Sequence, residues 1–195
     1  MASDLMQLSP LMQQAIAASQ ANDSQTALNL FTQACREEQS SAWPHFLLGA
    51  ELAQLGRIAE AETAYANAVI MAPDFRIARF ELGTLQFTSG RPSIAVVTWH
   101  PLLDLPDDNA LKLFVQGYVE LAQDAFDNAL QYFARGMQAN TENPPLNGNI
   151  QLLVTEIEKL RHSPSPVSAP APDEVPPEST DNHFLLSAYN KGSLH

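Results

Sequence analysis

Residues 42–75 read AWPHFLLGAELAQLGRIAEAETAYANAVIMAPDF, a pattern that predicts two short helices joined by a tight turn. Small residues stand at the eighth and twentieth positions, Gly49 and Ala61, where they would let the two helices approach closely. Tyr65, at the twenty-fourth position, supplies a ring to fill the space between them. Pro73 then ends the second helix, because proline cannot continue a helical hydrogen-bond ladder.

The same pattern recurs every 34 residues on both sides of this stretch. The eighth position of each block holds a small residue: Ala15, Gly49, Gly83 or Gly117. The twenty-fourth position holds an aromatic residue: Phe31, Tyr65, Trp99 or Phe133. The fifteenth position holds Asn22, Gly56, Gly90 or Asp124, residue types that tolerate the left-handed conformation which ends a helix before a sharp turn. One helix pair cannot bury its own apolar face, so the recurrence predicts a stack of such pairs.

This spacing and these residues resemble the tetratricopeptide repeat. The resemblance implies an all-α, right-handed solenoid of helix-turn-helix repeats. After a leader at 1–8, we expect repeats at 8–41, 42–75, 76–109 and 110–143. Their helices are expected at about 9–20, 24–38, 42–55, 58–71, 76–89, 92–103, 109–123 and 125–139.

The third and fourth blocks depart from the family pattern. Arg79 and Gln86, and Gln116 and Glu120, stand where the resemblance implies mostly apolar residues, which predicts an altered packing angle. Pro101 lies inside the expected second helix of the third block. It predicts that this helix is shortened or kinked.

The C-terminal part divides into three segments. Residues 144–162 predict a capping helix with one apolar face, formed by Leu146, Ile150, Leu153, Val154, Ile157 and Leu160. Residues 163–178 are rich in proline and predict a solvated, polyproline-like linker. Apolar residues return in 179–195, which we interpret as a short docking segment carried by Phe184, Leu185, Leu186 and Tyr189.

Composition restricts the choice of partner. The chain of 195 residues is expected to form one domain and a tail, and its 10 Lys and Arg against 22 Asp and Glu give a net charge of −12. This charge argues against nucleic acid and anionic membranes as partners.

No apolar run approaches the ~20 residues of a membrane span, and the N-terminus lacks the pattern of a secretion signal. We therefore expect a cytoplasmic protein without membrane insertion.

The sequence shows no constellation that would carry catalysis. The five histidines have no metal-ligand spacing, and no phosphate loop, nucleophile elbow or zinc motif is present. The single Cys35 excludes an internal disulfide and is interpreted as a packed, inert thiol. We expect neither an enzyme nor a bound cofactor or metal.

In the tetratricopeptide family, positions 2, 5, 9 and 12 of the first helices face a ligand in a concave groove. Carried over, these positions give the groove set, which is apolar for most of its length: Met12, Ile16, Trp43, Phe46, Ala50, Ile77, Phe80, Thr84, Phe87, Leu111, Phe114, Tyr118 and Leu121. The family's carboxylate clamp for chaperone tails is absent, since its four basic or amide positions hold Met12, Ile16, Ile77 and Glu81. The alternative is that individual rings of the set simply pack helix against helix.

The leading hypothesis is a scaffold that binds an apolar peptide or helix of a protein partner. In one interpretation the groove is self-occupied by Phe184, Leu185, Leu186 and Tyr189, within one molecule or exchanged between copies in a homo-oligomer. In the other, 179–195 serves another protein. Two alternatives stay open. The chain is similar in length and charge to the tetratricopeptide chaperones that hold hydrophobic translocators in type III secretion, and a regulatory subunit of a larger complex fits equally.

Overall fold

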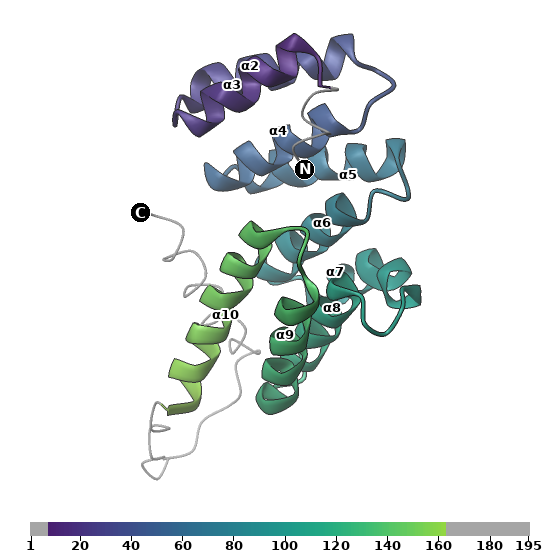
Figure 1. Ribbon diagram of the computed structural model, residues 1–195, viewed down its shortest axis with the longest axis vertical. Helices are drawn as coiled ribbons and strands as arrows, with labels where there is room; N and C mark the ends of the chain where they lie inside the picture. The colour runs from purple at the N-terminus through teal and green to yellow at the C-terminus, as the bar shows by residue number, and fades with distance from the viewer. Residues whose placement is uncertain (1–7, 163–195) are drawn as a thin grey trace, which may run out of the picture. The chain divides into compact units, whose positions relative to one another are not determined.

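The computed structural model describes residues 8–162, and these are helical without any strand (Figure 1). The helices are α2 (Pro10–Gln20), α3 (Ser24–Glu37), α4 (Trp43–Gln54), α5 (Ile58–Met71), α6 (Arg76–Thr88), α7 (Pro92–Trp99), the 3-10 helix η1 (His100–Asp104), α8 (Ala110–Leu121), α9 (Phe126–Ala139) and α10 (Pro144–His162). Apart from α7, their ends agree with the expected ends to within two residues. The all-α helical-repeat class predicted from the sequence is confirmed.

Where the sequence predicts one domain, the helices group into two compact units. The first unit holds residues 8–87 and 93–102, and therefore α2 to α7. The second holds residues 88–92 and 103–162, with α8, α9 and α10. Within the first unit α2 lies beside α3 and α4 beside α5, and within the second α8 lies beside α9 (Figure 1).

The turns inside the helix pairs use the residues predicted for them. Asn22, Gly56, Gly90 and Asp124 all adopt positive φ, between 56° and 77°. Three of these turns are closed by a hydrogen bond from a backbone N–H to the carbonyl five residues earlier. An example is the Arg57 amide, which donates to the Leu52 carbonyl at 2.9 Å. This arrangement is the Schellman motif, which satisfies carbonyls that the end of a helix leaves without partners.

Side-chain caps start three of the helices. The Ser9 hydroxyl accepts a hydrogen bond from the Met12 amide at 3.1 Å, and Pro10 follows at the first helical position. The Asp23 carboxylate accepts from the Thr26 amide at 3.2 Å, and the Asn109 side chain accepts from the Leu111 amide at 3.0 Å. These caps supply acceptors for amides that have no partner inside the helix.

The core of each helix pair is a ring packed on a small residue. A Cβ added to Gly49 would lie 2.7 Å from Cδ1 of Tyr65, and one added to Gly117 would lie 2.6 Å from Cε1 of Phe133. A Cβ on Gly83 would approach the Trp99 indole still more closely. Both distances are shorter than van der Waals contact, so the glycines let the helices approach as the sequence predicts.

Proline ends α7 where the sequence indicates a break. The α-helix stops at Trp99 and continues as η1, which contains Pro101.

The polar residues Arg79 and Gln86 of α6 find hydrogen-bond partners. Buried Gln86 donates to Glu62 at 3.1 Å and accepts from the Thr98 hydroxyl at 2.6 Å, and Arg79 donates to the Thr98 carbonyl at 3.4 Å.

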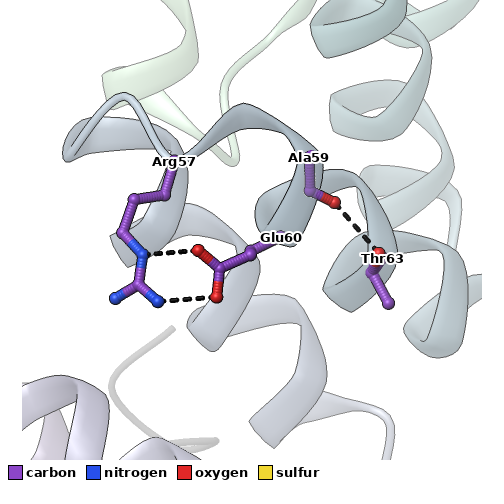
Figure 2. A network of polar contacts seen from close by, with 4 residues as sticks. All are labelled: Arg57, Ala59, Glu60 and Thr63. Carbon is purple, nitrogen blue, oxygen red and sulfur yellow. Dashed lines mark hydrogen bonds and ion pairs between the residues drawn. The ribbon is translucent and has the colours of Figure 1, made fainter.

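Polar contacts in the first unit occur both between helices and on the surface of one helix. The Ser19 hydroxyl on α2 donates to the buried Glu51 carboxylate on α4 at 2.6 Å. At the start of α5, Arg57 donates through Nε and Nη2 to both carboxylate oxygens of Glu60 (Figure 2). This pair is exposed and lowers the pKa of Glu60 through its hydrogen bonds, and exposed pairs of this kind contribute little to stability.

The helix α10 packs its apolar face in the second unit. Leu146, Ile150, Val154 and Ile157 are buried, whereas Leu152 on the opposite face is exposed. Arg161 pairs with Asp127 of α9 at 2.8 Å, and the Asn147 side chain donates to the Met137 carbonyl at 3.1 Å. Apolar burial and these polar contacts hold α10 against α9.

The glycine contacts make a direct prediction in the second unit. The Gly117→Ala variant should lower the free energy of unfolding by about 1–3 kcal/mol, because its methyl group would overlap the Phe133 ring. Gly148→Ala is the matched control, since a Cβ there meets nothing within 4 Å in α10 and alanine is the better helix former, by about 0.5–1 kcal/mol. Calorimetric unfolding of both variants measures the difference. Equal stability of the two variants would contradict the packing described.

Candidate functional site

The structure buries nearly half of the groove set. Met12, Phe80, Thr84, Phe114, Tyr118 and Leu121 all have less than a tenth of their surface exposed. The causes are visible in the second unit. The Phe114 ring packs where a Cβ of Gly136 would be, 2.5 Å from the ring atoms, and Tyr118 meets Phe133 edge-on at 5.3 Å between ring centroids. These side chains stabilise helix pairs and do not present a surface to a ligand.

The remaining members of the groove set stay at least partly accessible. Trp43 is 46% exposed, and the others are half-buried: Ile16, Phe46, Ala50, Ile77, Phe87 and Leu111. The other tryptophan of the chain, Trp99, is 0% exposed. Trp43 is therefore the most exposed member of the groove set.

Three rings meet there and form what we term the aromatic cluster: Trp43, Phe46 and Phe75. Trp43 lies on Phe75 at 4.7 Å between ring centroids and meets Phe46 edge-on at 5.8 Å. Phe46 and Phe75 are 5.1 Å apart, and the buried Tyr65 lies behind Phe46 at 5.8 Å. Tilted and edge-on contacts at such distances add about 0.5–1.5 kcal/mol per pair to area burial, so the cluster is held together without a ligand.

Two helix starts position the cluster. Trp43 begins α4, and Phe46 three residues later lies on the same face. Phe75 directly precedes α6, where its amide donates to the Ala72 carbonyl at 2.9 Å and its carbonyl accepts from the Arg79 amide at 3.1 Å. Phe75 is not part of the predicted groove set, because it lies one residue before the block that begins at Arg76. In the sequence, Phe75 can be found as an aromatic residue two positions before Ile77, a member of the groove set.

The sequence neighbours of the cluster carry little net charge. Burial lowers the pKa of His45, which lies between Trp43 and Phe46 in the sequence, so its imidazole is uncharged at neutral pH. Asp74 and Arg76 flank Phe75 in the sequence, and both are exposed and opposite in charge. The residues next to Phe75 in the chain thus add one negative and one positive charge, which balance.

The four positions that hold the carboxylate clamp in the family carry no basic side chain in this chain. Met12 is buried, Ile16 and Ile77 are half-buried, and Glu81 is a partly buried carboxyl whose pKa burial raises to about 7. An acidic group at this place would repel a terminal carboxylate once it ionises. This agrees with the sequence interpretation that no carboxylate clamp is present.

Other candidate chemistry is limited. Burial raises the pKa of Cys35 to about 11, so this half-buried side chain stays a thiol at neutral pH. Across residues 8–162, no three His, Cys, Asp or Glu side chains come together in a way that could hold a metal ion. None of the helices in that range combines the length and the hydropathy needed to cross a bilayer. Phe184, Leu185, Leu186 and Tyr189 lie outside the described residues.

Comparison with known proteins identifies the class of the fold. Residues 46–99 match the family model described as tetratricopeptide repeat. The MamA RS-1 ArsTM double mutant superposes with a TM-score of 0.57 at 12% identity, over 93% of this chain and 89% of the other. MamA 41-end from Desulfovibrio magneticus RS-1 gives 0.57 at 11%, over 94% and 91%. YrrB, described as a TPR protein with an unusual peptide-binding site, gives 0.54 at 14%, over 95% and 85%.

No curated protein matches the chain. The structural likenesses, at these low identities, concern the fold: an all-α stack of helix pairs. The family match covers most of residues 42–75 and most of the block that follows them. The match over residues 46–99 and the shared fold support the resemblance to the tetratricopeptide repeat that the residue pattern predicted.

The Glu81 carboxyl makes a prediction about pH. Its pKa is about 7 when folded against 4.5 for the free side chain, so the folded state favours the protonated form. Its stabilising contribution is full below about pH 4.5 and is lost as pH rises through about 7. Glu81→Gln, which resembles the protonated form, should therefore unfold like the parent at about pH 4 and be more stable by about 1–3 kcal/mol at about pH 8. Urea unfolding at the two pH values measures this. A difference between the two proteins that does not change with pH would contradict it.

Proposed function

We propose that this protein is a non-enzymatic, cytoplasmic scaffold that holds an apolar segment of a protein partner on the aromatic cluster. The observation that carries the proposal is the half-exposed Trp43, supported from behind by Phe46 and Phe75. Rigid aromatic residues of this kind dominate binding energy at protein interfaces, because they bury a large area with little loss of side-chain entropy.

The neighbouring accessible residues extend this surface. Ala50 lies one helical turn beyond Phe46 on α4, and Ile77 lies two residues after Phe75 on α6. Both are half-buried, so they offer apolar edges and little side-chain freedom to lose. The surface would suit a short extended or helical segment that contacts Trp43 at its centre.

Two further observations favour a peptide ligand. Helical-repeat proteins use the surfaces of their stacked units for binding. YrrB, which shares the fold, is described as having a peptide-binding site. The acidic charge of −12 disfavours nucleic acid as the partner.

The partner can be captured with a photo-crosslinking benzoylphenylalanine in place of Phe75, in living cells. The same crosslinker in place of Ile70 is the control, since Ile70 is 76% exposed on α5 and is no part of the cluster. A polypeptide captured only from the Phe75 position, through an apolar segment, is expected. A hydrophobic secreted client would indicate the chaperone alternative, and a subunit of a catalytic or membrane machine would indicate the regulatory one. Identical capture from both positions would contradict the proposal.

Substitution of Trp43 tests the same surface quantitatively. Trp43→Ala should weaken binding of the captured partner about 10- to 30-fold, as expected for the loss of an interface hot spot of about 2 kcal/mol. Ile70→Ala should change the affinity by less than about twofold, because most exposed residues contribute little. Isothermal titration with the purified partner measures both constants. Unchanged affinity in Trp43→Ala would overturn the assignment of the cluster as the binding surface.

A further inference from the structure

The carboxyl of Glu81 has no partner in the described structure. Glu81 lies on α6 four residues after Ile77, so the two side chains lie on the same face of the helix. Part of its surface stays accessible. Among residues 8–162, no group forms a hydrogen bond or an ion pair with this carboxyl.

The basic residues nearest to Glu81 in the chain do not balance its charge. Arg79 donates to the Pro73 carbonyl at 3.3 Å and to the Thr98 carbonyl at 3.4 Å, and Arg76 is exposed at the start of α6. Burial is the cause of the raised pKa of Glu81, about 7, and no cation offsets it. An ionised carboxylate that has lost much of its water is costly until a cation lies beside it.

Other polar side chains in the interior of the first unit are paired. The buried Glu51 carboxylate accepts from the Ser19 hydroxyl, and the Thr84 hydroxyl donates to the Phe80 carbonyl at 3.0 Å. Gln86 has its partners in Glu62 and Thr98. Since buried polar groups normally have partners, the unpaired carboxyl of Glu81 calls for a function.

Glu81 lies at the end of the surface that the proposed function uses. It follows Phe75 of the aromatic cluster by six residues, which is about 9 Å along a helix axis. Ile77 lies between them in the chain and is half-buried, so it continues the accessible apolar surface. An extended segment advances about 3.3 Å per residue, so a side chain about three residues from the one on Trp43 would reach Glu81.

Lys and Arg have the chemistry that this place requires. Their stems are apolar and can lie along Ile77, while the charged head reaches the carboxylate. A ligand that covers Glu81 with an apolar group would leave its carboxyl without water and without a partner. Pairs of opposite charge at an interface select among ligands mainly through this penalty on the wrong one.

We infer that Glu81 binds a Lys or Arg side chain of the partner segment that lies on the aromatic cluster. The inference deepens the proposed function, on which it rests for the binding surface. It gives Glu81 the role of a specificity-determining residue. Among apolar segments, those with a cation about three residues from the residue on Trp43 are the ones that this surface prefers.

Peptide display on the full-length protein tests the inference. Random peptides are selected at about pH 8, where a carboxyl with a pKa of about 7 is mostly ionised. The strongest binder is then synthesised in two forms, one with its Lys or Arg and one with norleucine in that place. Norleucine keeps the apolar stem of lysine and lacks the charge. Fluorescence anisotropy measures the affinity of both forms.

The parent protein should bind the cationic form about 10-fold more tightly, a difference of about 1.4 kcal/mol. Glu81→Gln, which resembles the protonated side chain, should reduce this preference to less than about twofold. Glu37→Gln is the matched control, since it removes one charge from an exposed position at the end of α3. Asp74→Asn removes the exposed charge beside Phe75. Both should keep the preference of the parent.

A preference that survives in Glu81→Gln, or that Asp74→Asn or Glu37→Gln reduces as much, would overturn the inference. Selected peptides without an enriched Lys or Arg would also overturn it. In these cases a loss of peptide affinity in Trp43→Ala would leave the proposed function standing. A selection that yields no peptide dependent on Trp43 would contradict the proposed function and the inference together.

Discussion

The contact between a small residue and an aromatic ring inside each helix pair is the constraint on which this structure depends. Gly49 faces Tyr65, Gly83 faces Trp99 and Gly117 faces Phe133 at distances that exclude a Cβ. The close approach buries the ring almost completely and fixes how the two helices lie on each other. The turn must then reverse the chain within a few residues. This is why Asn22, Gly56, Gly90 and Asp124 adopt the left-handed conformation at the same point of each block.

The same packing decides which aromatic residues are available for binding. In the second unit, Phe114 packs against Gly136 and Tyr118 against Phe133, so both rings belong to the core. In the first unit, Phe46 and Phe75 are packed from behind but keep part of their surface accessible, and together they hold Trp43 in a half-exposed position. A ring held this way loses little entropy when a ligand covers it. The binding surface we propose is therefore a consequence of how the helix starts pack.

The sequence predicted the fold well because every signal for it is local. Spacing of small and aromatic residues, left-handed turn residues and Pro101 act within one helix pair, and the helix ends follow from them. Burial was harder to predict, because it depends on which neighbour fills a space. Met12 and Phe80 occupy ligand-facing positions of the family pattern, yet they are buried in this chain. Likewise, the polar residues of α6 departed from the pattern, but Gln86 finds partners in Glu62 and Thr98, contacts that no spacing rule could reveal.

A double-mutant cycle between Gly49 and Tyr65 tests the central contact most directly. Gly49→Ala, Tyr65→Leu and the combined variant would be unfolded in urea, with tryptophan emission as the readout, since Trp43 and Trp99 both belong to the first unit. Because the added methyl would lie 2.7 Å from the Tyr65 ring, removal of the ring should relieve the cost of Gly49→Ala. The account predicts a coupling energy of at least about 1 kcal/mol between the two substitutions. Free energies that add to within about 0.3 kcal/mol would contradict it.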